Sequence, residues 1–360
     1  MSAVTSELLE TVAELWPGAD VVPAGTAGDG RPVRARYALL SRGDDPTVLV
    51  PVESATAAGA SLRRFSTASS WWETTSRVAA GAAVRALPGL LRQRVEIRGG
   101  HDGLAVHLSE VLGTPVSFSL SIGTARVNRK PVLQVFDEEG RCRAFAKVGW
   151  SENTCADVTA EGRALATVTA LEYQHVVPPP LLARTSWAGR PVLVIGPLQP
   201  SPWRRHRRAW TPPEEAMTEL ASSFASPDGR LTDSAWWQRQ WEATGALVDP
   251  VLRGRFGRAM ERVDGIVGRR ALSWGAWHGD WTPWNMAVSG DAVLLWDWER
   301  FETGVPMGLD PLHYVVNSFN SGVPASTEGV LRALCFASYR DRSLGGEDRK
   351  STRLNSSHVS

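Results

Sequence analysis

Three polar side chains that suit acid–base and metal chemistry lie within one short segment, WHGDWTPWNMAVSGDAVLLWDWERF, at residues 277–301. Asp280 follows His278 by two residues, and Asn285 follows Asp280 by five. Asp297 stands at the end of an apolar run. An aspartate can accept a proton from a hydroxyl, and amide and carboxylate oxygens are hard ligands that suit Mg²⁺. The spacing therefore favours a site that handles a hydroxyl together with a metal-bound group.

Phosphoryl transfer needs this combination of groups. It asks a protein mainly to hold an acceptor hydroxyl in line and to place cations between phosphate oxygens. A loop carboxylate, a loop amide and a carboxylate at a strand end supply those parts. Either turn alone, HGD or DWE, is also an ordinary polar turn beside a strand. Their joint order and spacing favour the phosphoryl-transfer interpretation.

The pattern H-G-D-x-x-x-x-N, followed by an apolar strand and D-W-E, resembles that of the aminoglycoside phosphotransferase and choline kinase family. The resemblance covers about residues 114–342. It implies that Asp280 is the catalytic base and that His278 shapes the catalytic loop. It also implies that Asn285 and Asp297 bind Mg²⁺, with ATP as the phosphate donor.

A lysine and a glutamate upstream fit the same resemblance. The chain has only three lysines, and Lys147 lies in the strand-like run RAFAKVGW. A charge on an apolar strand needs a partner, and Glu161 lies on the next expected helix, at about residues 155–173. In the family, such a pair holds the α- and β-phosphates of the nucleotide. The alternative is a lysine at a sheet edge or on the surface.

Two further segments carry weaker sequence patterns that indicate nucleotide binding. Gly123 lies in a loop between expected strands, where backbone N–H groups would cradle phosphates, and Asn128 matches an asparagine often found in the family. A solvated hairpin is the alternative for this loop. Gly196 and Leu198 follow the last strand, where the family's hinge binds adenine through its backbone. Pro197 lacks an N–H donor, so Leu198 is the expected donor.

The elements that position these residues fall into four parts. Residues 1–113 mix helices and strands and predict a small N-terminal α/β extension. Residues 114–198 are rich in strands, and residues 199–347 are mainly helical by periodicity. Residues 348–360 resemble translated adapter sequence and are expected to be non-native, the alternative being a polar tail. The resemblance implies an α+β, bilobal protein-kinase-like fold, with a β-rich N-lobe and a mainly helical C-lobe after the extension.

The composition limits which class of protein, which partners and which compartment we expect. Of the 360 residues, 43% are hydrophobic and 21% are charged, which is typical of folded proteins. The net charge of +1 predicts neither a nucleic-acid nor a membrane partner, and no apolar run reaches membrane-spanning length. Three widely spaced cysteines suit a reducing cytoplasm. Frequent Ala, Arg, Gly and Val indicate a GC-rich bacterial genome.

The expected partner is a small molecule with a hydroxyl acceptor, and no obligate protein partner is implied. Its identity stays open between a sugar, an amino-alcohol and an aminoglycoside-like compound. Acids and arginines are interspersed between residues 210 and 270, so the sequence predicts no strongly anionic pocket for a polycation. The chain has 16 tryptophans, five of them in the segment 277–301. They fit core packing, or an aromatic platform for a sugar ring or a cation.

The roles of two charged features stay open. Asp310 precedes a proline and fits a helix start, although the family also carries an aspartate near this place. The arginine-rich run at 204–208 is either a contact for an anionic substrate or a solvated segment.

Two rival functions are weighed against small-molecule phosphorylation. One is a nucleotide-binding regulatory module without turnover, which the intact Asp280, Asn285, Asp297 and Lys147 disfavour. The other is a protein kinase, which is disfavoured because no APE-like segment follows Asp297.

Overall fold

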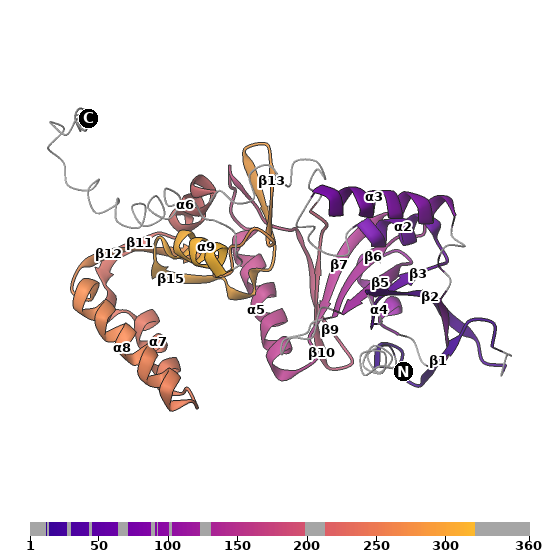
Figure 1. Ribbon diagram of the computed structural model, residues 1–360, viewed down its shortest axis with the longest axis horizontal. Helices are drawn as coiled ribbons and strands as arrows, with labels where there is room; N and C mark the ends of the chain where they lie inside the picture. The colour runs from indigo at the N-terminus through magenta and orange to yellow at the C-terminus, as the bar shows by residue number, and fades with distance from the viewer. Residues whose placement is uncertain are drawn as a thin grey trace, which may run out of the picture. The chain divides into compact units, whose positions relative to one another are not determined.

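The computed structural model describes the chain in two compact units (Figure 1). Unit 1 comprises residues 1–220 and 278–302, and unit 2 comprises residues 221–277 and 303–360. The residues described within them are 12, 14–26, 30–42, 45–63, 71–87, 91, 93–100, 103–122, 131–198 and 213–320. Among these residues, no helix is both long and apolar enough to cross a membrane.

A nine-stranded sheet forms the frame of unit 1. Every neighbouring pair is antiparallel, in the order β1-β4-β2-β3-β5-β6-β7-β10-β9. The strands are β1 (Ala19–Pro23), β2 (Val33–Arg42), β3 (Asp45–Pro51), β4 (Arg94–Gly99), β5 (Ser117–Ile122), β6 (Pro131–Phe136), β7 (Cys142–Val148), β9 (Leu181–Trp187) and β10 (Arg190–Ile195).

The expected extension and the expected nucleotide lobe share this sheet. Strand β3 pairs with β5, so that Val48 lies opposite Ser121 and Leu49 opposite Leu120. The boundary expected at residue 113 therefore falls between two neighbouring strands of one sheet.

Helices cover both faces of the sheet. One face packs against α4 (Leu104–Leu112) through a single continuous core, which includes Phe118, Leu133, Ala146 and Val194. The opposite face carries α2 (Ala55–Arg63) and α3 (Trp71–Ala86) at one end and α5 (Glu152–Val168) at the other.

The register places Lys147 on this second face. Residues directly opposite one another in a sheet share a face. Val48, Ser121, Val132 and Lys147 form such a row across β3, β5, β6 and β7. Val48 packs with the α2 and α3 residues Ala58 and Val84. The helices of the extension and α5 therefore lie on the same side of the sheet as Lys147.

Helix α5 starts three residues earlier than the periodicity predicts. The Ser151 Oγ accepts a hydrogen bond from the Thr154 backbone N–H at 3.3 Å, and the Thr154 Oγ1 accepts one from the Ser151 N–H at 2.7 Å. This reciprocal cap satisfies backbone donors at the helix start. The helix then ends at Val168, before the expected residue 173.

A second, small sheet of unit 1 contains the middle of the segment 277–301. Strand β13 (Met286–Ser289) forms an antiparallel hairpin with β14 (Ala292–Leu295), and β8 (Val176–Val177) pairs with β14 in parallel. The hairpin begins directly after Asn285 and ends two residues before Asp297. Its geometry therefore brings the two ends of the segment back toward each other.

Unit 2 combines a three-stranded sheet with helices around its own tryptophan-rich core. That core contains Leu231, Trp237, Met260 and Trp274. Asp310 lies in the first turn of its last helix and is buried, while the run 204–208 lies outside the described residues. The elements are β11 (Ser226–Arg230), β12 (Ala271–Trp277), β15 (Glu302–Pro306), α7 (Ala235–Gly245), α8 (Pro250–Val267) and α9 (Leu309–Asn320). The division between the units falls within α6 (Glu214–Ser223), after Leu220.

Candidate active site

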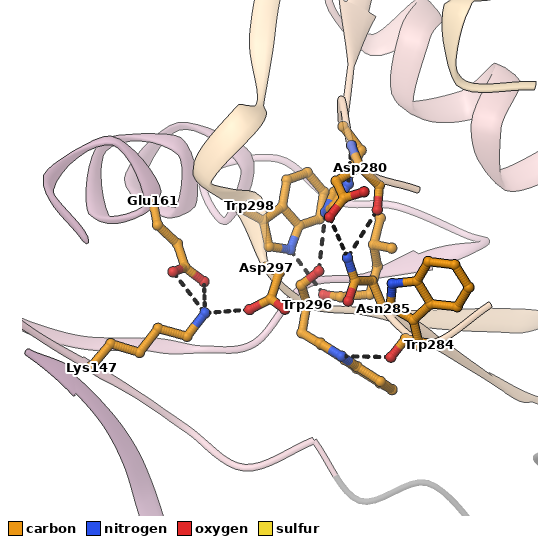
Figure 2. Close-up of polar contacts among 10 residues, drawn as sticks. Lys147, Glu161, Asp280, Trp284, Asn285, Trp296, Asp297 and Trp298 are labelled. Atoms are coloured by element: carbon orange, nitrogen blue, oxygen red, sulfur yellow. Dashed lines mark hydrogen bonds and ion pairs between the residues drawn. The ribbon is translucent and has the colours of Figure 1, made fainter. Parts of the chain in front are cut away.

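Three charged residues from distant parts of the chain meet in unit 1 (Figure 2). The Lys147 Nζ on β7 donates to both carboxylate oxygens of Glu161 on α5, each at 2.7 Å. It also donates to the Asp297 Oδ1, which lies 2.5 Å away just after β14. One ammonium thus bridges the expected phosphate-binding glutamate and an expected metal ligand.

Burial and neighbouring charges together shift the pKa values of Lys147 and Glu161. The side chains of Lys147 and Glu161 are 9% and 0% exposed, whereas that of Asp297 is 40% exposed. Burial by itself lowers the pKa of Lys147, but the carboxylates of Asp297 and Glu161 outweigh it and raise that pKa above its usual value. Burial raises the pKa of Glu161, and the charge of Asp297 adds to this effect, while Lys147 opposes both. With all three groups ionised, two carboxylates face one ammonium, and the surplus negative charge favours an added cation.

Asp297 has an uncommon backbone conformation. Its φ of 64° and ψ of 59° lie in the left-handed region, which few residues other than glycine and asparagine or aspartate adopt. The next residue, Trp298, is fully buried and its indole N–H donates to the Leu295 carbonyl at 2.9 Å. This anchor holds the reversal that directs the Asp297 carboxylate toward Lys147. Such conformations are often found at functional sites.

Asp280 and Asn285 are joined across the loop that follows β12. The Asn285 Nδ2 donates to the Asp280 carbonyl at 3.0 Å and to the Asp280 Oδ2 at 2.9 Å (Figure 2). Because only the amide nitrogen can donate, these bonds turn the Asn285 Oδ1 away from Asp280. The loop therefore orients a carboxylate that can take a proton and an amide oxygen that can bind a cation.

His278 is a structural residue of this loop. It is fully buried, its Nε2 lies 3.1 Å from the Trp296 carbonyl, and its Nδ1 accepts the Asp280 backbone N–H at 3.3 Å. The second contact requires an unprotonated Nδ1, so Nε2 carries the proton and donates to Trp296. The ring also packs edge-on against Trp298 with centroids 4.8 Å apart. These contacts fit the expected role of shaping the loop.

Comparisons with solved structures return small-molecule kinases. A ternary streptomycin–ATP complex of APH(2")-IIa has a TM-score of 0.44 and 11% identity, over 68% of this chain and 87% of that one. A proposed fructosamine-3-kinase from Haemophilus somnus 129PT has a TM-score of 0.40 and 13% identity, over 66% and 87% of the two chains. A choline/ethanolamine kinase family protein from Mesorhizobium loti has a TM-score of 0.38 and 15% identity, over 59% and 68%.

The resemblance to the aminoglycoside phosphotransferase and choline kinase family rests on the motifs H-G-D-x-x-x-x-N and D-W-E of the sequence. The fold of the chain is of the mixed α+β class that the sequence predicts. No family model and no curated protein matches the chain. At such low identity, the roles of individual residues rest on their own contacts in unit 1.

The remaining site predictions differ in how the structure bears on them. Gly196 is placed at the end of β10, but its N–H donates to the Pro180 carbonyl at 2.7 Å and is already used. Leu198 follows it and is half-buried, so it keeps its place as the expected adenine donor. Gly123 and Asn128 lie outside the described residues. Sequence reasoning missed the role of Trp296, whose indole N–H donates to the Trp284 carbonyl at 3.1 Å and ties the strand end to the loop.

Gly279 offers a direct test of how tightly the loop is held. Its φ is +81°, and a Cβ added there would lie 2.6 Å from the Arg300 carbonyl oxygen. We expect Gly279→Ala to lower the free energy of unfolding by about 1–3 kcal/mol and to reduce activity, because the backbone that carries Asp280 must shift. Urea unfolding and turnover measurements check this.

Gly290→Ala is the matched control. Gly290 also has a positive φ, of +66°, but nothing lies within 4 Å of the added Cβ. The Gly290→Ala variant should therefore lose some stability and keep its turnover. Equal losses of turnover in both variants would contradict the close approach of Gly279 to Arg300.

Proposed function

We propose that this chain transfers the γ-phosphoryl group of ATP to a hydroxyl of a small molecule. The observation that supports it best is the three-way contact of Lys147 with Glu161 and Asp297, found in the same unit as the Asp280–Asn285 pair. These are the residue types that phosphoryl transfer requires for holding phosphates, binding a cation and accepting a proton.

Asp280 is the proposed general base. The hydrogen bond from Asn285 to its Oδ2 orients the carboxylate. As the acceptor oxygen bonds to the γ-phosphorus, the bond from that phosphorus to the bridging oxygen breaks and its electrons leave with ADP. The acceptor's hydroxyl proton passes to the Asp280 carboxylate. General base catalysis of this kind contributes about 10²–10⁴-fold to the rate.

Asn285 and Asp297 are the proposed Mg²⁺ ligands. When bound, Mg²⁺ neutralises charge on the transferred phosphate. The donor set fits, since a carboxylate and an amide oxygen are hard ligands and Mg²⁺ takes its other ligands from phosphates and water. The described residues contain no cluster of three or more His, Cys, Asp or Glu side chains that would form a complete protein cage. The surplus negative charge around Lys147 also suits a cation.

Lys147 is the proposed contact for the α- and β-phosphates. Glu161 is fully buried and holds the ammonium through both carboxylate oxygens, which fixes the direction of the long lysine side chain. Leu198 is proposed as the backbone donor to adenine, and Gly123 with Asn128 as the loop over the phosphates.

The reducing cytoplasm is the proposed compartment. Cys142 and Cys155 are free thiols, as is common in proteins of reducing compartments. Cys335 lies outside the described residues.

A transfer assay with γ-labelled ATP tests the proposal. The purified chain is incubated with a panel of hydroxyl compounds, with and without a chelator of Mg²⁺. We expect a labelled small molecule that disappears when Mg²⁺ is removed. Nucleotide binding without any transfer would instead support a regulatory module, and labelled protein would support a protein kinase.

A further inference from the structure

An open groove of unit 1 lies beside helix α5. Its volume is about 650 Å³, which is within the range of small-molecule sites in proteins. Five residues of α5 between Cys155 and Arg163 line one wall, and four residues between 185 and 191 of the β9–β10 hairpin line the other. Figure 1 shows α5 next to these two strands, against which it packs. None of the lining residues is among those proposed to bind ATP, Mg²⁺ or the acceptor.

The groove lies on the other side of α5 from Glu161. Successive residues of an α-helix are about 100° apart around its axis, so Thr159 and Arg163, each two residues from Glu161, lie almost opposite it. Glu161 is fully buried and holds the Lys147 ammonium, whereas Thr159 and Arg163 are exposed. A molecule in the groove therefore contacts a different face of α5 from the one that carries the three-charge cluster.

Part of the groove is apolar because small side chains line it. A Cβ added to Gly149 would lie 2.8 Å from both the Cys155 Sγ and the Pro191 Cγ, so only glycine lets the thiol and the proline ring meet there. The Gly149 N–H fixes this approach by donating to the Pro191 carbonyl at 2.9 Å. Ala156 and Ala160 extend the same wall along α5. Together these residues give the groove an apolar surface.

The polar part of the groove carries a positive charge. Arg163 is the only charged residue among those that line it. Within the described residues, no carboxylate forms an ion pair with the Arg163 guanidinium, and no group forms a hydrogen bond with the Ser186 hydroxyl. A guanidinium has only donors, and a hydroxyl can donate as well. Such donors, with no acid beside them in the groove, favour a negatively charged ligand.

We propose that this groove binds a small carboxylate that carries a short apolar chain. Arg163 receives the carboxylate, with the Ser186 hydroxyl as a second donor, while Ala156, Ala160 and Pro191 cover the chain. One lining cation matches the single charge of a carboxylate better than the almost two charges of a phosphate group. Side chains of a helix lean toward its N-terminus, so Arg163 reaches back along the groove toward Cys155.

Disulfide trapping at Cys155 tests the ligand class, because this half-buried free thiol lines the groove. The full chain carries Cys142→Ser and Cys335→Ser, which leaves Cys155 as its one thiol. The probes are the symmetrical disulfides of 4-mercaptobutanoate, 4-mercaptobutanamide, 4-mercaptobutylamine and 3-mercaptopropyl phosphate. The Cys155 thiolate attacks a probe sulfur and forms a new disulfide, and the departing thiolate takes up a proton.

The labelled fraction is measured by intact mass at equilibrium with excess 2-mercaptoethanol. We expect the carboxylate probe to label about 2- to 5-fold better than the other three, as an exposed charge pair allows. Arg163→Gln should remove this preference. Arg255→Gln is the matched control, because Arg255 is an exposed arginine on α8 of unit 2, and it should keep the preference.

A second pair of variants tests the groove itself. Ala156→Trp fills it from an exposed position of α5 and should reduce labelling by every probe. Thr167→Trp, at another exposed position of α5 that does not line the groove, should not. Urea unfolding followed by circular dichroism checks that both variants are folded.

Three results would overturn the carboxylate site. They are a preference for the amide, amine or phosphate probe, a carboxylate preference that survives Arg163→Gln, and unchanged labelling in Ala156→Trp. Excess MgATP should leave labelling unchanged, and loss of labelling would contradict a site separate from the nucleotide. The readout does not need turnover, so an inactive chain would contradict the proposed function and leave this site intact.

Discussion

Replacing Asp280 by asparagine is expected to reduce turnover by about 10²–10⁴-fold, the range that a general base contributes. Asparagine has nearly the same shape, and its side-chain oxygen can still accept the hydrogen bond that Asn285 now donates to the Asp280 Oδ2. It cannot take up a proton from the acceptor. The loop should therefore keep its geometry while the chemical step loses its base, so that ATP affinity stays nearly unchanged.

The matched control for this substitution is Asp291→Asn. Asp291 is an exposed aspartate in the turn between β13 and β14, in the same unit and the same catalytic segment. It should keep full turnover. Turnover is measured at saturating ATP and acceptor, and ATP affinity by calorimetry. If the Asp280→Asn variant is as active as the Asp291→Asn variant, Asp280 is not the general base.

The local part of the site was accessible from the sequence because short-range bonds build it. Asp280 and Asn285 are five residues apart, and the hydrogen bonds between them close a single loop. The contact of Lys147 with Glu161 joins a strand to the next helix, so a charged residue on an apolar strand was enough to indicate it. In both cases a pattern of residue types within a short stretch of chain determines which side chains meet.

Contacts that depend on distant pairing were not accessible in the same way. The β3–β5 pairing that joins the expected extension to the expected nucleotide lobe spans about 70 residues, and alternation alone does not choose a strand's partner. The left-handed conformation of Asp297 depends on the burial of Trp298, which its residue type does not reveal. The Gly196 N–H is taken by Pro180, because the chain before β9 returns to the end of β10.

Replacing Lys147 by methionine is expected to lower the free energy of unfolding by about 3–5 kcal/mol, the cost of removing one partner from a buried ion pair. Methionine keeps much of the length of lysine but leaves the carboxylate of Glu161, which is 0% exposed, without its ammonium. Asp297 is 40% exposed and can be hydrated, so the loss comes mainly from Glu161. Urea unfolding followed by circular dichroism measures it, and productive use of MgATP should fall in the same variant.

The exposed pair of Arg141 with Glu139 provides the control for burial. The two side chains are 66% and 63% exposed, so Glu139→Gln should change stability little, because solvent screens such pairs. Losses of equal size in Glu139→Gln and Lys147→Met would contradict the importance of burial.

A double variant separates the structural role of Lys147 from its proposed catalytic role. Lys147→Met combined with Glu161→Leu removes both charges, and replacing a buried ion pair by apolar residues of similar volume is often neutral for stability. We expect the double variant to regain most of the stability lost in Lys147→Met. It should remain defective with MgATP, because no ammonium is left for the phosphates. A double variant that recovers both stability and activity would show that Lys147 serves only to neutralise Glu161, and the nucleotide would then have to bind elsewhere.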